Sequence, residues 1–265
     1  MSEEFIRDGS VSQVGVEHPC LDHGFVKLVD FMGSDQAILD SARVSTGATN
    51  NPKRDRGLIR YLYRNAHTSP FEMPVFRFHI KAPIFVARQW IRHRTASVNE
   101  VSGRYKFLDP ETYMPAVFKY QSTSNHQGGD AYVENAENSR AAELVYDVYE
   151  EYRENYSQLI DMGISREQAR IAMPVGQYTE WYWQMDLHNL LHFLDLRMDP
   201  HAQAEIREYA KAIFGILASM QEFSYTMEIF NQVREVQTLI KQAMNIDKEF
   251  EALPDYLRQF IEARS

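Results

Sequence analysis

The residues best suited to chemistry lie in one short run at positions 92–105, RHRTASVNEVSGRY. Its three arginines and His93 stand beside a single acid, Glu100, in a chain whose formal net charge is -9. A guanidinium group presents paired N–H donors that match the oxygens of a phosphate or a carboxylate. Lysine, the more common solubilising cation, does not occur in the run. The composition therefore predicts a site for a small anion in preference to a solvated basic loop.

Three other positions extend this hypothesis, each with an alternative that the sequence leaves open. Gln89 and Arg92 are three residues apart on a predicted helix and share a face that leads into the run, although a polar helix surface has the same pattern. Arg170 stands in an apolar stretch, ARIAMP at 169–174, where either a surface arginine or a cationic pocket fits. The segment HTSPFE at 67–72 combines a ring, two hydroxyls and a carboxylate, and taken alone it is a polar turn.

The segment DLHNLLHFLDLR at 186–197 carries the densest group of functional side chains. His188 and His192 are four residues apart, so on a helix they point the same way, at a spacing that also binds zinc. No third ligand stands at a recognisable offset, which makes a metal site the less favoured interpretation. Arg197 lies about 140° further round the helix than His192, because each residue advances the helix by roughly 100°. We therefore expect a ligand that wraps the helix end, or a site built between subunits of an oligomer.

The candidate nucleophiles have unsuitable surroundings. Cys20 is the only cysteine, which excludes an intrachain disulfide framework and a cysteine-rich metal cluster. It lies near the N-terminus, a poor location for a nucleophile. Ser102 has no base at a recognisable spacing, so a hydrogen-bonding role is favoured. Neither a Rossmann glycine motif nor a P-loop motif occurs, so a bound nucleotide would lie outside both designs.

The composition indicates an ordinary globular protein. The chain has 265 residues, 44% of them hydrophobic, which is enough to bury the core of one large domain or two small ones. Its apolar stretches are too short for a transmembrane helix, and the acidic start MSEE lacks the order of a secretory signal, so we expect a cytoplasmic protein. The negative net charge argues against a protein that coats nucleic acid.

Apolar periodicity predicts alternating strands and helices. Strands are expected at 24–31, 75–81 and 178–183. Helices are expected at 35–43, 56–66, 83–92, 141–162, 166–172, 186–198, 201–222 and 225–243. Asp35 is expected to cap the first helix, and Ser165 with Gln168 forms a capping-box pattern. The basic run is expected to be a loop, 119–140 a polar surface excursion, and 244–265 a charged tail. The predicted fold class is α+β, or mixed α/β, with one domain at 1–243: a central mixed or antiparallel sheet flanked by helices, and a helix-rich C-terminal half.

The run 92–102 has the form RHRxxSxNExS, and here the chain closely resembles the flavin-dependent thymidylate synthases, the ThyX family. Further segments agree with that family in order along the chain: GFVKLVD at 24–30, the HxSPFE segment at 67–72, KAPIFVARQWIRHR at 81–94, SGRY at 102–105, ARIAMP at 169–174, DLHNLLHFLDLR at 186–197 and HAQ at 201–203. The resemblance covers most of 24–220 and implies a ThyX-like fold. It does not extend to 119–140 or to the residues beyond about 243.

The resemblance implies that two anionic ligands share one cleft. The positions that would hold dUMP are Gln89, Arg92, Glu100, Val101, Ser102, Gly103, Arg104, Arg170 and Arg197. The positions that would hold FAD are Ser69, Arg92, His93, Arg94, Thr95, Glu100, Asp186, His188 and His192, with His67 and Glu72 near the flavin. The family is a homotetramer whose active sites are shared between subunits, which would account for the two differently facing groups on 186–197.

The reaction that the resemblance implies is conversion of dUMP to dTMP, with 5,10-methylenetetrahydrofolate as carbon donor and FADH2, regenerated by NADPH, as hydride source. Arg197 would be catalytic, because a fixed cation near uracil N3 favours the ionised, more electron-rich ring. Two alternatives remain from the residues alone. One is a non-catalytic nucleotide-binding or RNA-associated regulator that uses the arginines. The other is a metal-dependent hydrolase that uses His67, His93, His188 and His192.

Overall fold

A five-stranded antiparallel sheet forms the centre of the fold. The computed structural model describes residues 13–44, 52–105, 111–123 and 128–244. The strand order is β1-β2-β3-β7-β4, with β1 at one edge and β4 at the other. The strands are β1 (Glu17–Cys20), β2 (Gly24–Met32), β3 (Val75–Pro83), β7 (Tyr178–Asp186) and β4 (Ser97–Glu100).

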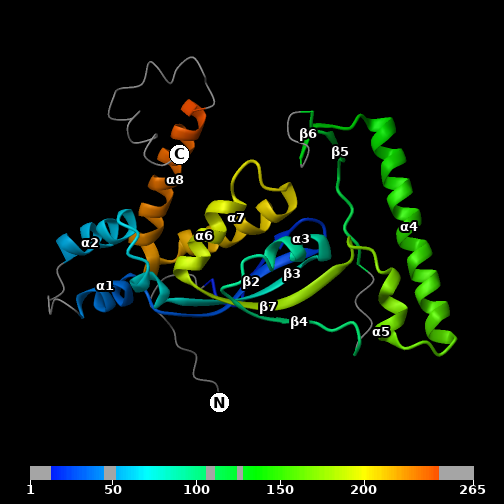
Figure 1. Ribbon diagram of the computed structural model, residues 1–265, viewed down its shortest axis with the longest axis horizontal. Coiled ribbons are helices and arrows are strands. Elements are labelled where there is room, and N and C mark those ends of the chain that lie inside the picture. The colour runs from blue at the N-terminus through cyan, green and yellow to red at the C-terminus, as the bar shows by residue number, and fades with distance from the viewer. Residues whose placement is uncertain (1–12, 45–51, 106–110, 124–127, 245–265) are drawn as a thin grey trace.

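Helices cover one face of this sheet (Figure 1). Alternate residues of β3 explain which face is covered: Phe76, Phe78 and Ile80 are fully buried, whereas Arg77 and His79 point to the other side. The covering helices are α3 (Ile84–Trp90), α6 (Leu187–Arg197) and α7 (Ala204–Ser219). After the short turn η3 (Gln221–Phe223), α8 (Ser224–Met244) packs against α7 and α2.

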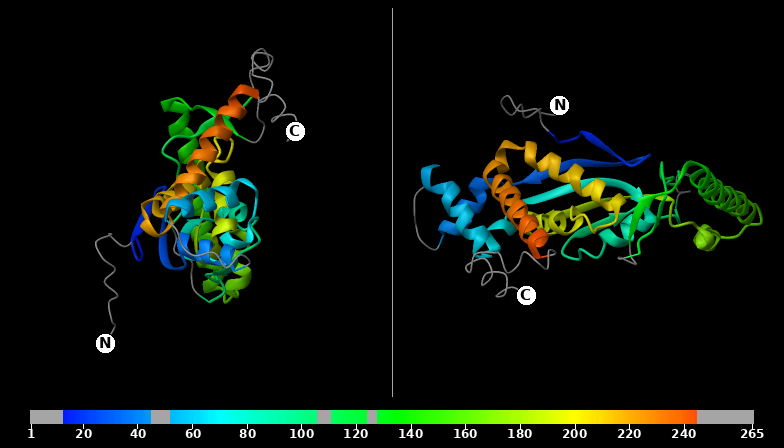
Figure 2. Two further views of the ribbon diagram at one scale, coloured as in Figure 1. Left: turned by 90° about the vertical axis from the view of Figure 1, so that its left-hand side faces the viewer. Right: turned by 90° about the horizontal axis from the view of Figure 1, so that it is seen from above.

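The two ends of the elongated molecule carry different elements (Figure 2). At one end lie α1 (Asp35–Arg43), α2 (Pro52–Arg64) and η1 (Ser69–Glu72). The other end is an arm that stands away from the sheet (Figure 1). The elements of this arm are β5 (Lys119–Gln121), β6 (Gly129–Tyr132), α4 (Asn135–Asp161), α5 (Arg166–Ala169) and η2 (Arg170–Ala172).

The arm has a small apolar core of its own. Tyr152, Tyr156 and Ala169 pack together there, separately from the main core under the sheet. The arm meets the body through Tyr149, whose hydroxyl donates to the Tyr113 carbonyl at 2.9 Å. The same hydroxyl lies against Gly176, where a Cβ atom would be 2.0 Å from it. A larger residue at this position would therefore require the Tyr149 ring to move.

An aromatic cluster holds α3 and α6 against β7. The Trp90 ring of α3 lies 5.3 Å from the Trp183 ring of β7 and 4.8 Å from the Phe193 ring of α6. Trp183 and Phe193 also contact each other at 5.1 Å, and all three side chains are almost completely buried. Large buried rings contribute strongly to core stability. The cluster therefore fixes the end of α3, where the basic run begins.

The prediction that the whole basic run is a loop is wrong, because Ser97–Glu100 forms strand β4. It pairs with β7 in antiparallel register, with Val98 opposite Trp183 and Glu100 opposite Trp181. The sequence SVNE has no apolar alternation, and all of its residues are exposed. Backbone pairing with a distant strand, rather than burial of side chains, makes this segment extended.

The prediction of a polar excursion over 119–140 is also wrong in part. Its first part contains the short strand pair β5 and β6, and its last residues belong to α4, which begins at Asn135. The Asn138 side chain anchors this first turn, because its Oδ1 atom accepts from the Phe118 backbone N–H at 2.8 Å. A solvated first turn has no apolar periodicity, so the pattern concealed the start of the helix.

The two predicted helix caps differ from the observed ones. Asp35 is the first residue of α1, and its carboxylate instead accepts from the backbone N–H groups of Tyr225 and Thr226 at the start of α8. Ser165 precedes α5 as expected, but its side chain makes no capping hydrogen bond, and its carbonyl accepts from the Gln168 N–H. For these two helices the amino-acid pattern located the start to within one residue, but not the partners of the Asp35 and Ser165 side chains.

The mixed α/β class, the antiparallel sheet and the helix-rich C-terminal half are confirmed. The helix expected at 56–66 begins at Pro52 and ends at Arg64, and the helix expected at 201–222 spans Ala204–Ser219. The described part of the chain has no helix with the length and apolar character that crossing a bilayer requires. The charged tail was predicted at 244–265, and all of it after residue 244 lies outside the described residues.

Candidate functional site

The basic run crosses from the end of α3 to the edge of the sheet. The helix ends at Trp90, and the His93 backbone N–H donates to the Trp90 carbonyl at 3.0 Å, which turns the chain sharply. Strand β4 then pairs with β7, and the Val101 N–H donates to the Glu180 carbonyl at 2.9 Å. Both ends of the run are therefore anchored to the sheet and its covering helices.

His93 contacts both His192 and Arg197, which point in different directions from α6. Arg197 Nε donates to His93 Nε2 at 3.0 Å, and the His93 and His192 rings lie 6.2 Å apart. The Phe193 ring meets His93 edge to face at 4.9 Å. The helix geometry had separated His192 from Arg197, and the structure reconnects them through a side chain from another segment. Burial, followed by the charge of Arg197, lowers the pKa of His93 to about 4.

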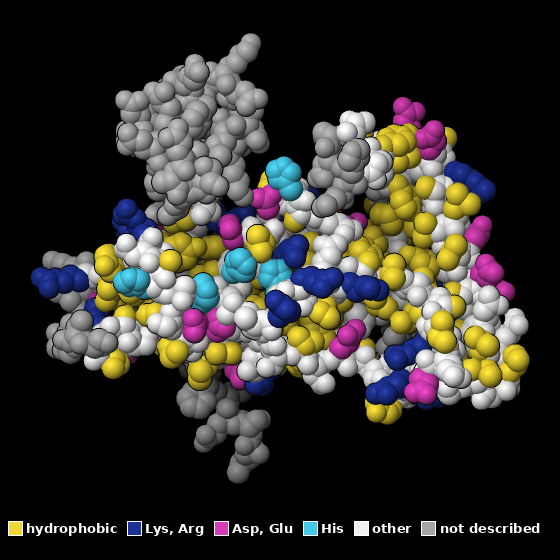
Figure 3. All heavy atoms as spheres, viewed as in Figure 1, with side chains coloured by type: hydrophobic (Ala, Val, Ile, Leu, Met, Phe, Trp, Pro, Cys, Tyr) yellow, Lys and Arg dark blue, Asp and Glu magenta, His cyan; other side chains and the backbone are white. Residues whose placement is uncertain are grey.

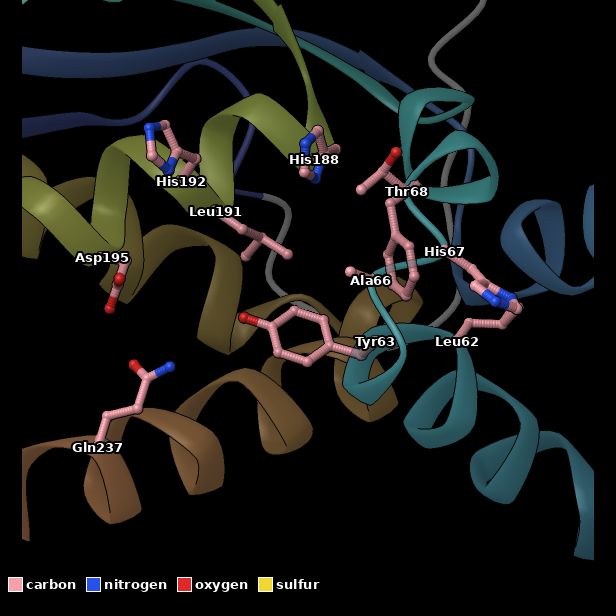
Figure 4. Close-up of a pocket in the computed structure, with 11 residues that line it drawn as sticks. Leu62, Tyr63, Ala66, His67, Thr68, His188, Leu191, His192, Asp195 and Gln237 are labelled. Atoms are coloured by element: carbon pink, nitrogen blue, oxygen red, sulfur yellow. The ribbon is translucent and has the colours of Figure 1, made fainter. Parts of the chain in front are cut away.

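A pocket of about 230 Å³ lies beside this group, between α2, η1, α6 and α8 (Figure 4). His188 and His192 line it from α6, and His67 lines it from the turn after α2. The Tyr63 hydroxyl points toward the side of the pocket that carries Asp195 and Gln237, and His67 lies on the opposite side (Figure 4). Apolar walls with hydrogen-bonding groups at the rim suit a flat ring system with polar edges.

The turn that presents His67 has an unusual backbone. Ala66 has φ of 53°, in the left-handed region that glycine normally occupies. The Ala66 N–H donates to the Tyr63 carbonyl, and the His67 N–H donates to the Leu62 carbonyl at 2.9 Å. This is the pattern of a Schellman C-cap, which ends α2 and sends the chain into the pocket. The strained residue therefore lies next to a candidate flavin-binding residue.

The outer part of the run offers charged groups to solvent. Arg92 and Arg94 are exposed, and Arg104 lies against the Tyr105 ring, with its guanidinium carbon 5.6 Å from the ring centre. Glu100 accepts a hydrogen bond of 2.6 Å from the Thr179 hydroxyl. Histidine side chains form a line across this face that continues into Lys and Arg side chains (Figure 3). The run is thus a cationic rim next to the pocket, since its His93 ring lies 6.2 Å from the ring of His192, which lines the pocket.

Other predicted positions have structural partners that spacing did not reveal. The Gln89 amide donates to the Gln203 side chain, across from α3 to the start of α7. Asp186 caps α6, because its carboxylate accepts from the Asn189 backbone N–H at 2.9 Å and from its side-chain amide at 2.7 Å. Arg166 donates to the Tyr105 carbonyl at 3.0 Å, which places α5 of the arm beside the end of the run. Arg170 follows four residues later, on η2, and is half-buried.

The predicted site residues differ in how far their side chains are exposed to solvent. The exposed positions are His67, Ser69, Glu72, Arg92, Arg94, Thr95, Glu100, Val101, Arg104 and His192. The half-buried positions are Gln89, His93, Ser102, Arg170, Asp186, His188 and Arg197, and Gly103 is buried. Sequence reasoning missed Tyr63, Asp195 and Gln237 as pocket residues. Only Asp195 had a signal, since it lies in the segment that was already singled out.

The alternative of a metal site finds no support among the residues that the structure describes. Within residues 13–44, 52–105, 111–123 and 128–244, no group of three or more His, Cys, Asp or Glu side chains is arranged to hold a metal ion. His93 instead bonds to Arg197, and a cation beside it opposes metal ligation. The hydrolase hypothesis therefore has no ligand set among these residues.

The cationic run and the neighbouring pocket, on a sheet covered by helices on one face, suit a protein that binds an anionic ligand beside a flat ring system. The family model described as thymidylate synthase complementing protein, Thy1, matches residues 27–220. The flavin-dependent thymidylate synthase of Treponema denticola is 55% identical over 205 residues, covering 76% of this chain and 77% of that protein. That of Thermus thermophilus is 54% identical over 200 residues, covering 75% of this chain and 73% of that protein. The chain therefore belongs to the flavin-dependent thymidylate synthase family.

Solved structures agree with this assignment. The UMP/dUMP methylase PolB from Streptomyces cacaoi, bound with 5-Br dUMP, superposes with a TM-score of 0.73 at 32% sequence identity. The match covers 81% of this chain and 97% of that one. A second structure of the same methylase, bound with 5-Br UMP, has a TM-score of 0.70 and 34% identity, and covers 79% of this chain and 94% of that one. The family and the fold are thus both established.

Proposed function

We propose that this flavin-dependent synthase converts dUMP to dTMP, with 5,10-methylenetetrahydrofolate as carbon donor and with FAD that NADPH returns to its reduced form. Family membership supports the reaction, and the related methylase in solved structures holds brominated analogues of UMP and dUMP. The observation that carries the proposal is the contact of Arg197 with His93, which puts a half-buried cation of α6, a helix that lines the pocket, against the basic run.

The donor groups of the pocket region suit a flavin. Its apolar walls and its histidines fit a flat ring system with polar edges, and the exposed arginines of the run fit a pyrophosphate. When bound, FAD supplies the redox chemistry, namely the hydride for the new methyl group. The residues that we propose to hold it are Ser69, Arg92, His93, Arg94, Thr95, Glu100, Asp186, His188 and His192, with His67 and Glu72 near the ring.

The neighbouring cationic groups suit a nucleoside monophosphate. Arg92 and Arg104 are exposed and able to pair with phosphate oxygens, and Ser102 adds a hydroxyl. We propose the following residues for dUMP: Gln89, Arg92, Glu100, Val101, Ser102, Gly103, Arg104, Arg170 and Arg197. Burial lowers the pKa of Arg197, but an arginine keeps its charge in this setting. In a partly desolvated site that charge acts strongly on the uracil ring and favours its ionised, electron-rich form.

The position of Cys20 supports a reaction without a cysteine nucleophile. Burial raises the pKa of this thiol to about 12, so the thiolate is not available near neutral pH. Cys20 lies on β1, and the basic run continues through β4 at the opposite edge of the sheet. A cation acting on the ring is therefore the form of activation that the arrangement supports.

Three further assignments belong to the proposal. The enzyme works as a homotetramer with active sites shared between subunits, which accords with a cationic rim that is open to solvent in one chain. The catalytic domain spans residues 1–243, and the protein acts in the cytoplasm. Gel filtration with light scattering measures the assembly, and a monomer that turns over dUMP would remove the shared-site assignment.

The first experiment records the visible absorption of the purified protein, and then adds NADPH without oxygen, with and without dUMP. Flavin bands that bleach, and bleach faster with dUMP, support the proposal. A colourless protein that takes up no added FAD contradicts it and leaves a nucleotide-binding regulator as the alternative.

Arg197→Ala tests the activation role. We expect turnover to fall by roughly a hundredfold or more, as for other residues that stabilise charge in the transition state. Arg140→Ala is the control, because Arg140 is exposed on α4 and pairs only with Glu143 of the same helix among the described residues. Near wild-type turnover of Arg197→Ala, with dUMP binding unchanged, would contradict the role.

A further inference from the structure

His93 of the basic run faces α6 in a way that its proposed flavin contact does not explain. Its Nε2 atom faces Arg197 Nε at 3.0 Å, so this ring nitrogen is directed at α6. Phe193 supports the ring edge to face at 4.9 Å, and Phe193 is itself held between Trp90 and Trp183. The imidazole is therefore fixed by the aromatic cluster at the centre of the fold.

The hydrogen bond uses one particular donor of the arginine. A guanidinium group is planar, so fixing the Nε–H direction also fixes the plane and the directions of both terminal amino groups. Among the residues that the structure describes, neither amino group has a hydrogen-bond partner, so both are left for a ligand. Arg197 is the last residue of α6, where the side chain has few backbone constraints. Without a partner for Nε, its long side chain would sample many rotamers.

The chemistry of the pair requires a neutral imidazole. Nε2 accepts only when it carries no proton, and in neutral imidazole the proton then lies on Nδ1. The charged and titratable groups that face or flank His93 are Arg197 and His192 of α6 and the neighbouring Arg92 and Arg94. None of them is an acid, so none of these groups in the described part of the chain favours the protonated form of the ring.

We propose that His93 is a positioning residue for substrate: its Nε2 atom holds the Arg197 guanidinium in the orientation that meets the uracil ring of dUMP. The inference rests on the proposed function, because it takes Arg197 as a contact of dUMP. It is separate from flavin binding, since the atom involved is directed at α6. Loss of this acceptor is expected to weaken dUMP binding even when the flavin is fully bound.

Two substitutions at one position separate the hydrogen bond from packing. His93→Leu keeps an apolar side chain against Phe193 but has no acceptor, and His93→Gln keeps an acceptor at similar reach. The dissociation constant of dUMP is measured by calorimetry on oxidised enzyme saturated with FAD, and flavin occupancy is measured separately by absorbance. We expect His93→Leu to weaken dUMP binding by roughly tenfold to a hundredfold, the range for a hydrogen bond to a charged group. His93→Gln should stay within about threefold of the wild type, because it keeps the acceptor.

A double-mutant cycle shows whether His93 acts through Arg197. In the Arg197→Ala background, His93→Leu should cause no further loss of dUMP affinity, because the side chain that it positions is gone. Additive losses would overturn the inference and indicate that His93 acts on dUMP independently of Arg197. Equal losses for His93→Leu and His93→Gln would also overturn it, since packing and not the acceptor would then be responsible.

A ligand-free measurement distinguishes this inference from the proposed function. Nitrogen NMR of histidine-labelled protein reports whether His93 Nε2 is unprotonated and hydrogen-bonded at neutral pH. We expect an unprotonated Nε2 whose signal shifts in Arg197→Ala and stays unchanged in the Arg140→Ala control. A protonated Nε2, or a signal that ignores Arg197, overturns the inference. A wild-type protein that shows the hydrogen bond between His93 and Arg197 and yet binds no dUMP would contradict the proposed function, but not the hydrogen-bonded pair.

Discussion

Replacing Asp35 with alanine should remove a cap that joins two helices far apart in the sequence. Its buried carboxylate accepts from the Tyr225 N–H at 2.7 Å, the Thr226 N–H at 3.2 Å and the Thr226 hydroxyl at 2.6 Å. Loss of a helix cap costs about 1 kcal/mol, and a buried hydroxyl left without its acceptor costs about 1 to 2 kcal/mol more. At roughly 3 °C per kcal/mol for a chain of this size, Asp35→Ala should lower the melting temperature by about 7 °C.

Asp35→Asn is the matched comparison. Burial raises the pKa of Asp35, although the bonds from Thr226 and Tyr225 oppose this, so the site does not favour a charge. An amide oxygen still caps α8, and we expect a cost below about 1 kcal/mol. Differential scanning calorimetry of the three proteins measures both effects. Asparagine as damaging as alanine would contradict a cap made by an uncharged acceptor, because the charge would then be essential.

The raised pKa of Asp35 also predicts how the stability of the fold changes with pH. A carboxyl group whose pKa is higher in the folded state holds its proton more tightly there, so its contribution to stability is complete below the unfolded pKa. That contribution decreases as the pH rises through the raised folded-state value. The melting temperature of the wild type relative to Asp35→Asn should therefore fall as the pH rises above about 4. A relative melting temperature that rises over this window would contradict the assignment.

Four other substitutions test local features of the fold by thermal or urea unfolding. Arg43→Met should lower the free energy of unfolding by about 3 to 5 kcal/mol, since it leaves the buried partner carboxylate of Asp55 without this cation, and a loss below about 1 kcal/mol would contradict the buried ion pair. Ala66→Gly should raise the free energy of unfolding by about 1 kcal/mol by relieving its left-handed backbone, and no gain would indicate that the turn is not strained. Gly24→Ala should lower it by about 3 kcal/mol, because a Cβ there would lie 2.7 and 2.8 Å from two backbone carbonyl oxygens. Gly57→Ala lies in α2, and its Cβ would have no atom within 4 Å, so it should raise the free energy of unfolding by about 0.8 kcal/mol. Equal effects of the two glycine changes would contradict the packing argument.

Apolar periodicity predicted the elements that bury a face, and failed where burial does not determine the conformation. Strand β3 alternates strictly and was expected at nearly its observed bounds. Strand β4 buries nothing, and it depends on pairing with β7, some eighty residues later. Apolar periodicity reports which side chains of a segment are buried. A strand that is held only by backbone hydrogen bonds to a distant segment therefore has no such pattern. The first turn of α4 was missed for a similar reason.

The candidate site was predictable as a type of chemistry, but not as a geometry. The arginines of the run indicated an anion site from composition alone, and the resemblance to a family supplied the ligands. The contact between His93 and Arg197 spans 104 positions, so no spacing rule reaches it. The Asp35 cap spans 191 positions to Thr226 in the same way. Such contacts follow from the packing of α3 and α6 on the sheet, which only the three-dimensional structure contains.

The separate core of the arm has a consequence for how the molecule opens. Since Tyr152, Tyr156 and Ala169 pack apart from the main core, the arm is a candidate cooperative unit that unfolds locally at a lower free energy than the whole protein. Arg170 lies in this unit, so a nucleotide that pairs with Arg170 would also oppose local opening, by mass action. Amide hydrogens of α4 and α5 would then exchange more slowly as ligand is added. The arm would report occupancy of the site through its exchange rates, with no change in its average position.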